Sequence, residues 1–419
     1  MKMKNKTFLF LVVYLFLLVY NAGTNETNKV INRYVSIFFN ASPKETNTSS
    51  TIEKLNASTL RILANKIHEH YEKLFQHKAF NGCVLVAIED KIIYENAWGY
   101  SDIRQKQCLN TNSIFQLASV SKVFTAVAVL KLYEQNKLQL TDLVTKYIPD
   151  FPYKDVSIHH LLNHTAGLPN YLHLMPEIGR QDTVLSHWSV MDFLIRKKLR
   201  QEFKTGKRHK YCNTNYAVLA CLIEKISGMS YSDFLKKEIF IPLNMNQTNT
   251  IHYVDIFDEN TTTSHEYKSR AVPFYAGDFI LGDKSIYSSI HDLFQFSQAF
   301  LNGKVVKDST IRLMTQGVKT NRYGMLYGYG IRIKYNEDAN KTIWFHNGWW
   351  HGYRTSFQMR PKDKITVIIL SNHIHKTTYF THPIFQTIDE ILYQENTDNT
   401  NSEEKNSTHT VYPKLDDEE

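Results

Sequence analysis

The sequence lacks most of the motifs that would fix a protein's class at once. Among its 419 residues there are only 10 Pro and 16 Gly, too few for a fibrous or low-complexity chain. It contains neither GxxxxGKS/T nor GxGxxG, so it has no glycine-rich loop to cradle a phosphate or a dinucleotide. Hydrophobic residues make up 42% of the chain, which is too apolar for a disordered protein. These absences leave a globular protein of one large domain or a few smaller ones.

Cysteine and metal-ligand patterns are also scarce. The spacing of the cysteines forms no CxxC and no Cys/His cluster and selects no disulfide pairing, so we interpret them as free buried thiols. They are Cys83, Cys108, Cys212 and Cys221. His160 and His164 stand four apart on a predicted helix, but no carboxylate accompanies them as in HExxH. The sequence therefore predicts no metal and no organic cofactor.

The N-terminus has the layout of an export signal. Lys2, Lys4 and Lys6 precede an apolar run over Phe8–Tyr20, and small residues follow it. The run is short of the roughly 20 residues of a transmembrane helix. No Cys follows it for lipid attachment, and Tyr20 makes a poor cleavage position. We expect residues 1–23 to be a signal peptide or an N-terminal membrane anchor, and the protein to be exported as a periplasmic, extracellular or anchored protein.

Composition divides the rest of the chain into three parts. Residues 24–57 are rich in Asn, Thr and Ser and are predicted to form a polar linker. Residues 58–395 are predicted to form the structured domain, and 396–419 a disordered acidic tail. The formal net charge of +8 is spread along the chain apart from the N-terminal lysines. We interpret the basic runs as solvated surface, and nucleic acid is not an expected partner.

Hydrophobic periodicity within 58–395 alternates between helices and strands. A long, almost wholly apolar helix over 119–136 is typical of a buried central helix. Strands are predicted at 82–88, 91–98, 329–335, 353–360 and 366–371, and further helices at 58–74, 215–226, 289–301 and 383–394. Because a lone hairpin is marginally stable, the strands from both ends should join one antiparallel sheet. The predicted fold class is α/β (α+β), an antiparallel sheet flanked by helices with an inserted all-helical domain.

Ser119 and Lys122 form an SxxK pattern at the start of the apolar helix. A serine in the first turn lies near unpaired N–H groups and the positive end of the helix dipole. Lys122 falls on the same face one turn later. Desolvation would lower the pKa of this lysine and make it a credible base for the neighbouring hydroxyl. Taken alone, however, the pattern is explained better by a helix-capping serine followed by a surface lysine.

A second segment, Tyr211-Cys212-Asn213, supplies further candidates. A phenol near an ammonium can carry a proton between a nucleophile and a leaving group. The amide of Asn213 can hydrogen-bond both a lysine and a substrate carbonyl. The competing interpretation is a capping turn before the helix at 215–226.

The third segment is His346-Asn347-Gly348. A glycine here lets an acyl group approach the backbone closely. The N–H of Trp349, with that of Ser119, could then form an oxyanion hole. His346 could bind a carboxylate or assist proton transfer. The competing interpretation is a core histidine beside a turn glycine.

In this order, the three segments resemble the motifs of the serine β-lactamase and DD-peptidase (penicillin-binding protein-like) superfamily, especially its class C-like and low-molecular-weight esterase branch. The resemblance extends over about residues 58–395. The stretches that carry it are Phe80–Tyr100, Phe115–Thr125, Leu138–Tyr171 and Gly282–Asn302. It implies Ser119 as the acylated nucleophile, Lys122 as its base, Tyr211 as a proton shuttle and Asn213 as a substrate-orienting amide.

The resemblance also places His346 and Gly348 on a strand that forms the third motif, where many members carry Lys-Thr-Gly. A histidine there loses a permanent cation, which weakens the expectation of an efficient β-lactamase. Trp349 and Trp350 stand where similar members often have small residues, and two bulky rings would reshape the acyl pocket or provide a binding platform.

The sequence thus predicts an exported serine hydrolase that acts on an ester, amide or lactam through an acyl-enzyme. The alternatives are a DD-peptidase or D-amino-acid amidase acting on cell-wall peptides, and a non-catalytic sensor that has kept the fold. A structural or scaffold protein has only the linker and the acidic tail in its favour. The expected partner is a small-molecule or cell-wall peptide substrate.

Overall fold

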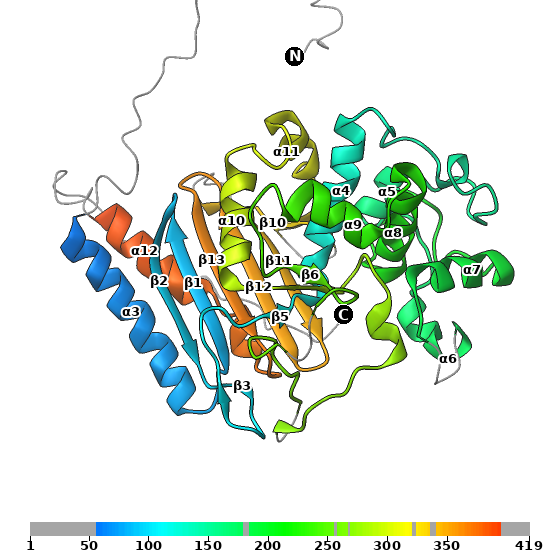
Figure 1. Ribbon diagram of the computed structural model, residues 1–419. Coiled ribbons are helices and arrows are strands. Elements are labelled where there is room, and N and C mark those ends of the chain that lie inside the picture. The colour runs from blue at the N-terminus through cyan, green and yellow to red at the C-terminus, as the bar shows by residue number, and fades with distance from the viewer. Residues whose placement is uncertain are drawn as a thin grey trace, which may run out of the picture. The chain divides into compact units, whose positions relative to one another are not determined.

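The computed structural model describes residues 56–178, 184–254, 258–266, 269–320, 324–335 and 341–394 (Figure 1). All of them belong to the larger of two contact units, Leu55–Glu419. The predicted leader at 1–23, nearly all of the linker and the acidic tail lie outside the described residues. Among the described helices, none is both long and apolar enough to cross a membrane.

An antiparallel sheet joins strands from both ends of the domain, as the sequence predicts. Its order is β2-β1-β13-β12-β11-β10-β9-β8, and every neighbouring pair is antiparallel. The strands are β1 (Gly82–Ile88), β2 (Lys91–Trp98), β8 (Val318–Lys319), β9 (Met325–Tyr327), β10 (Arg332–Lys334), β11 (Ile343–Trp350), β12 (Tyr353–Arg360) and β13 (Ile365–Ser371). Short strands form two small sheets, β3 (Tyr100–Asp102) with β4 (Gln107–Cys108), and β5 (Phe115–Gln116), β7 (Ile286–Ser288) and β6 (Asn249–Thr250).

Both faces of the sheet are buried along its central strands. Every residue of β1 and β13 is buried, because successive side chains of a strand point to opposite faces and helices pack on each. On one face, α3 (Ala57–Gln76) packs against β2 and against α12 (His382–Gln394). On the other, α10 (Ile290–Leu301) packs against β1 and β13 and joins the main core (Figure 1).

The segment between the two halves of the sheet is mainly helical, as predicted. It contains α4 (Ser121–Glu134), α5 (Ile158–Leu162), α6 (Met175–Ile178), α7 (His187–Lys197), α8 (Asn213–Ser227) and α9 (Tyr231–Leu235), and α11 (Asp308–Met314) follows α10. Nearly all of α4 is buried, in agreement with the central helix expected from its apolar sequence. Helix α8 packs against both α4 and α7 and completes the helical layer beside the sheet.

Three details differ from the sequence-based expectations. Strand β11 was not predicted from periodicity, because the polar and glycine residues of its centre interrupt the apolar pattern of a buried strand. His164 does not share a helix with His160: α5 ends at Leu162, and His164 adopts a left-handed conformation with φ 59°. Among the four unpaired cysteines, Cys108 is exposed rather than buried.

Arg360 fixes α12 to the sheet through a buried ion network. Its side chain lies in β12 and is 1% exposed. It forms ion pairs with Asp363 at 2.7 Å and with Asp389 of α12 at 2.6 Å. A buried charge that loses a partner is costly, because nothing replaces its lost hydration.

We therefore expect Asp363→Ala to destabilise the fold by about 3–5 kcal/mol. Urea unfolding followed by circular dichroism measures the loss. Asp192→Ala, which removes the exposed i,i+4 partner of Arg196, is the matched control and should cost less than about 1 kcal/mol. Equal losses in the two variants would contradict the role of the buried network.

Candidate active site

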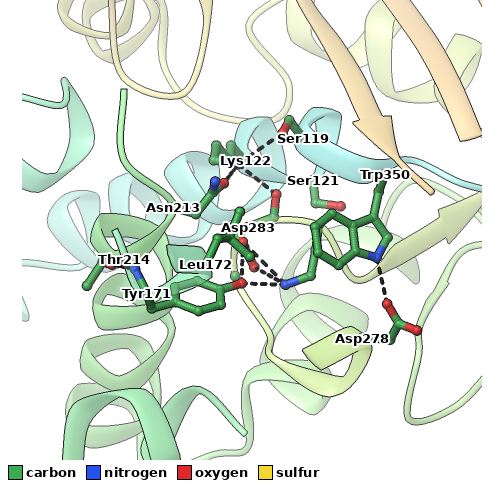
Figure 2. A network of polar contacts seen from close by, with 12 residues as sticks. Ser119, Ser121, Lys122, Tyr171, Leu172, Asn213, Thr214, Asp278, Asp283 and Trp350 are labelled. Atoms are coloured by element: carbon green, nitrogen blue, oxygen red, sulfur yellow. Dashed lines mark hydrogen bonds and ion pairs between the residues drawn. The ribbon is translucent and has the colours of Figure 1, made fainter. Parts of the chain in front are cut away.

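The ammonium of Lys122 lies at the centre of the site. The side chain is completely buried in the first turn of α4. Its Nζ donates to Ser119 Oγ at 3.2 Å, to Asn213 Oδ1 at 2.8 Å and to the backbone carbonyl of Asp283 at 2.9 Å (Figure 2). The structure thus brings three of the predicted residues together. The SxxK serine and lysine are in direct contact, and the lysine is not the surface residue that the competing interpretation requires.

Ser119 lies in a strained turn just before α4. It occupies the 3-10 turn Ala118–Val120, not the first turn of the α-helix, and is 7% exposed. The preceding Ala118 adopts a left-handed φ of 48°, which costs a non-glycine residue on the order of 1 kcal/mol or more. The surrounding contacts hold this turn in place, and its exit into α4 sets the spacing between the hydroxyl and the amine.

Gly348 is the contact that holds the turn from the side of the sheet. A Cβ at this position would lie 2.2 Å from Thr355 Oγ1, 2.3 Å from the carbonyl oxygen of Leu117 and 3.0 Å from Ala118 Cβ. The same Leu117 carbonyl accepts a hydrogen bond from Thr355 Oγ1 at 2.7 Å. Only a glycine lets β11 approach the Ser119 turn this closely. Its function in the structure is close backbone packing, and the glycine lies within a strand rather than in a turn.

Tyr211 and Asn213 reach the site from the start of α8. Cys212 is the N-cap, so Asn213 is the first helical residue, and its side chain accepts from Lys122. The Tyr211 ring centroid is 4.9 Å from Lys122 Nζ and 4.4 Å from the ring of His164. His164 in turn accepts from the Cys212 N–H through Nδ1 at 3.2 Å. A buried histidine therefore supports the tyrosine, which gives His164 a role that its sequence spacing did not suggest.

His346 is buried next to the site and is held neutral. Its Nε2 lies 3.1 Å from the Tyr327 hydroxyl and its Nδ1 2.7 Å from the Asn347 carbonyl. Burial, followed by the charges of Arg332 and Lys122, lowers its pKa well below the usual value. Its ring centroid is 6.2 Å from that of Tyr211. A neutral imidazole can relay a proton or accept a hydrogen bond, but it does not supply the cation of a Lys-Thr-Gly motif.

The two tryptophans of β11 lie on opposite faces of the strand. Trp349 is 47% exposed, and its ring lies 4.7 Å from the Arg354 guanidinium. Its side chain therefore points away from the face that carries His346 and Gly348. The backbone N–H of Trp349 is predicted to take part in an oxyanion hole. Its position is set by the backbone of β11, which lies next to the Ser119 turn, and not by the indole.

Residues that sequence analysis missed complete the surroundings. Asp283 supplies a backbone carbonyl to Lys122, and its carboxylate accepts from the Tyr171 hydroxyl at 2.7 Å. The Arg332 guanidinium lies 5.2 Å from the Tyr211 ring centroid. Asp283 lies within a stretch that carries the family resemblance, but a main-chain acceptor leaves no signature in a side-chain pattern. Within the described residues, no group of three or more His, Cys, Asp or Glu is placed to hold a metal.

The neutral histidines make stability depend on pH. In the unfolded chain a histidine titrates near 6.5, whereas burial lowers the pKa of His209 to about 4 and those of His346 and His164 well below 6.5. Below pH 6.5 the unfolded chain binds more protons than the folded one. The stabilisation is present above this pH and is lost as pH falls, by up to about 1.4 kcal/mol per unit for a histidine that stays fully neutral.

We expect urea midpoints to stay nearly level from pH 7.5 to about pH 6.5 and to fall from there to pH 5. The fall should be less steep in His346→Gln, because that variant removes one buried group that the unfolded chain would protonate. His173→Gln, at an exposed position, is the control and should follow the wild type. An unchanged slope in His346→Gln would contradict the buried neutral imidazole.

Known proteins resemble this chain in sequence and in fold. The family described as Beta-lactamase matches residues 63–384. A penicillin-binding protein of Bacillus subtilis (strain 168) is 33% identical over 339 residues, which are 77% of this chain and 74% of that protein. A D-aminopeptidase of Brucella anthropi is 26% identical over 321 residues, which are 77% of this chain but 60% of the longer relative.

Solved structures agree with the sequence relatives. The octameric penicillin-binding protein homologue from Pyrococcus abyssi has a TM-score of 0.69 at 25% identity, over 81% of this chain and 78% of that one. D-amino acid amidase from Ochrobactrum anthropi SV3, with a TM-score of 0.65 and 18% identity over 82% of this chain, shares the fold. The match over residues 63–384 spans nearly all of the described elements, and the chain belongs to the beta-lactamase family of serine hydrolases.

Proposed function

We propose that this serine hydrolase transfers acyl groups through a covalent ester on Ser119, from an ester, amide or lactam substrate. The observation that carries the proposal is the buried Lys122 amine, which lies 3.2 Å from the Ser119 hydroxyl and is fixed by Asn213 and the Asp283 carbonyl. An activated nucleophile needs a base within hydrogen-bond reach and a further group that orients that base. The nucleophile Ser119, its base Lys122 and the groups that orient this base lie within hydrogen-bond reach of one another.

The chemistry follows from the positions of these groups. With Lys122 in its neutral amine form, Ser119 Oγ attacks the substrate carbonyl carbon while its proton passes to the free electron pair of Lys122 Nζ, directly or through the Tyr211 hydroxyl, which converts the amine into an ammonium. The developing oxyanion accepts from the N–H groups of Ser119 and Trp349. When the bond to the leaving group breaks, the departing nitrogen or oxygen takes a proton from the same pair. Water then repeats the sequence on the ester and releases the acid.

A second candidate is hydrolysis of an amide or peptide of D-amino acids. The D-aminopeptidase and the penicillin-binding protein among the relatives support it. A structural observation favours it as well: the Arg332 guanidinium lies 5.2 Å from the Tyr211 ring and 5.8 Å from the Tyr327 ring. A cation beside the proposed proton shuttle suits the peptide form of this candidate, whose C-terminal carboxylate would lie near the scissile bond.

A non-catalytic sensor is the third candidate, and the site argues against it. A protein that only binds has no need to keep a buried amine on a serine hydroxyl together with Asn213 and Tyr211. We further propose that the protein is exported through the N-terminal segment at 1–23. The positively charged start and the short apolar run of that segment support export.

We expect a fluorophosphonate to form a single adduct on Ser119, seen by intact-mass spectrometry and peptide mapping. Ser119→Ala should give none, and Lys122→Ala should lower the labelling rate at least about 100-fold, as expected for loss of a general base. Lys131→Ala removes a lysine at the other end of the same helix and is the control. Labelling of another residue in the wild type would overturn the proposal, and a penicillin adduct would favour the peptide candidate.

We expect Gly348→Ala to lower the labelling rate of Ser119 by about 100-fold, because an added Cβ has to displace the Leu117 carbonyl or Thr355. The variant should still fold, and circular dichroism checks this. Gly228→Ala, whose added Cβ meets nothing within 4 Å, is the matched control. That variant should lose some stability through its positive φ of 71° and keep the labelling rate. Equal labelling rates in the two glycine variants would refute the packing role of Gly348.

A further inference from the structure

We propose that Trp350 determines substrate specificity: its indole closes the site at the end beyond Gly348 and restricts the acyl group to short chains. This inference rests on the proposed acyl transfer through Ser119. Its basis is the position of Trp350 on the strand and a set of buried contacts that fix the ring, none of which the proposed chemistry uses.

The first observation is the position of Trp350 on β11. Residues two apart on a strand share a face and lie about 7 Å apart along it. Trp350 therefore follows Gly348 on the face that packs against the Ser119 turn. Trp349 lies on the opposite face beside Arg354. Of the two bulky residues, only Trp350 is on the face towards the site.

The second observation is that Trp350 also meets the opposite side of the site. The Lys284 ammonium lies 4.7 Å from the indole ring. Lys284 directly follows Asp283, whose carbonyl accepts from the catalytic candidate Lys122. The contact between Lys284 and Trp350 therefore joins the segment that holds the amine to the strand that holds the Ser119 turn. It bridges the two sides where a longer acyl chain would have to pass.

The third observation is that the indole is rigidly held. Trp350 Nε1 donates to Asp278 Oδ1 at 2.6 Å, and His351 Nε2 lies 3.1 Å from the same oxygen. The other carboxylate oxygen accepts from the Tyr275 N–H at 2.8 Å, and Asp278 is 1% exposed. The Tyr275 ring stacks on the indole at 5.8 Å between centroids and an angle of 26°. A ring with this many contacts does not swing aside at low cost.

Lys284 is fixed as firmly from its own side. It is 2% exposed, lies 3.4 Å from both carboxylate oxygens of Asp283 and donates to the Tyr171 hydroxyl. A buried ammonium stays in place only when such partners compensate its charge. The Lys284 side of its contact with Trp350 is therefore fixed within the fold. Because partners already compensate the charge of Lys284, the length of the acyl chain rather than its charge should decide which acyl groups enter.

The test compares 4-nitrophenyl acetate, butyrate and octanoate. In the wild type we expect kcat/KM to fall at least 10-fold from acetate to octanoate. In Trp350→Ala the octanoate-to-acetate ratio of kcat/KM should rise at least 10-fold, because removing an indole opens room for several methylenes. Trp350→Leu, which keeps apolar packing, decides the question if Trp350→Ala does not fold. Asp278→Ala, which releases the indole, should shift the ratio in the same direction by a smaller factor.

Trp349→Ala should keep the acetate-to-octanoate ratio of the wild type, whatever its absolute rate. An unchanged ratio in Trp350→Ala or Trp350→Leu, with normal fluorophosphonate labelling of Ser119, would overturn the role of Trp350 and leave the acyl transfer standing. Absence of both ester turnover and labelling in the folded wild type would instead overturn the proposed function.

Discussion

The buried ammonium of Lys122 must be solvated by protein oxygens, because a charge without water or partners is too costly to keep in a core. The oxygens come from distant parts of the chain: a hydroxyl from the turn before α4, an amide from the start of α8 and a carbonyl from the loop before β7. This requirement brings the helical layer, the loop and the turn to one point. The arrangement that satisfies the lysine also places an amine against a serine hydroxyl.

The sheet adds a constraint on the same point. Strand β11 can approach the Ser119 turn only because Gly348 has no side chain, and the contact keeps Ala118 in its left-handed conformation. The turn is thus held between the polar partners of Lys122 and the backbone of β11. Neither set of contacts is sufficient alone, since one fixes the amine and the other fixes the nucleophile. Backbone strain of this kind persists only where the surrounding contacts hold the strained conformation in place.

The sequence predicted correctly those elements whose own residue pattern agrees with their place in the fold. The hairpin of β1 and β2 and the strand β12 occur at their predicted bounds, and the apolar α4 is buried as its composition indicates. Periodicity did not reveal strand β11, because its His346 and Gly348 serve the site at the expense of the strand pattern, and only the family resemblance placed these residues on a strand. Ser119, Lys122 and Asn213 were found because their side chains make the contacts. The Asp283 carbonyl was not, since a backbone acceptor can belong to any residue.

The pairing of β1 with β13 has a consequence for how the domain forms. Gly82 lies opposite Ser371 in the sheet, so the first strand finds its neighbour only after almost 300 residues. Until β13 is present, β1 offers one edge of unpaired N–H and C=O groups to any other extended chain. The sheet is therefore completed only after the whole intervening segment has been made. A chain that stops short of β13 is an aggregation hazard rather than a smaller working enzyme.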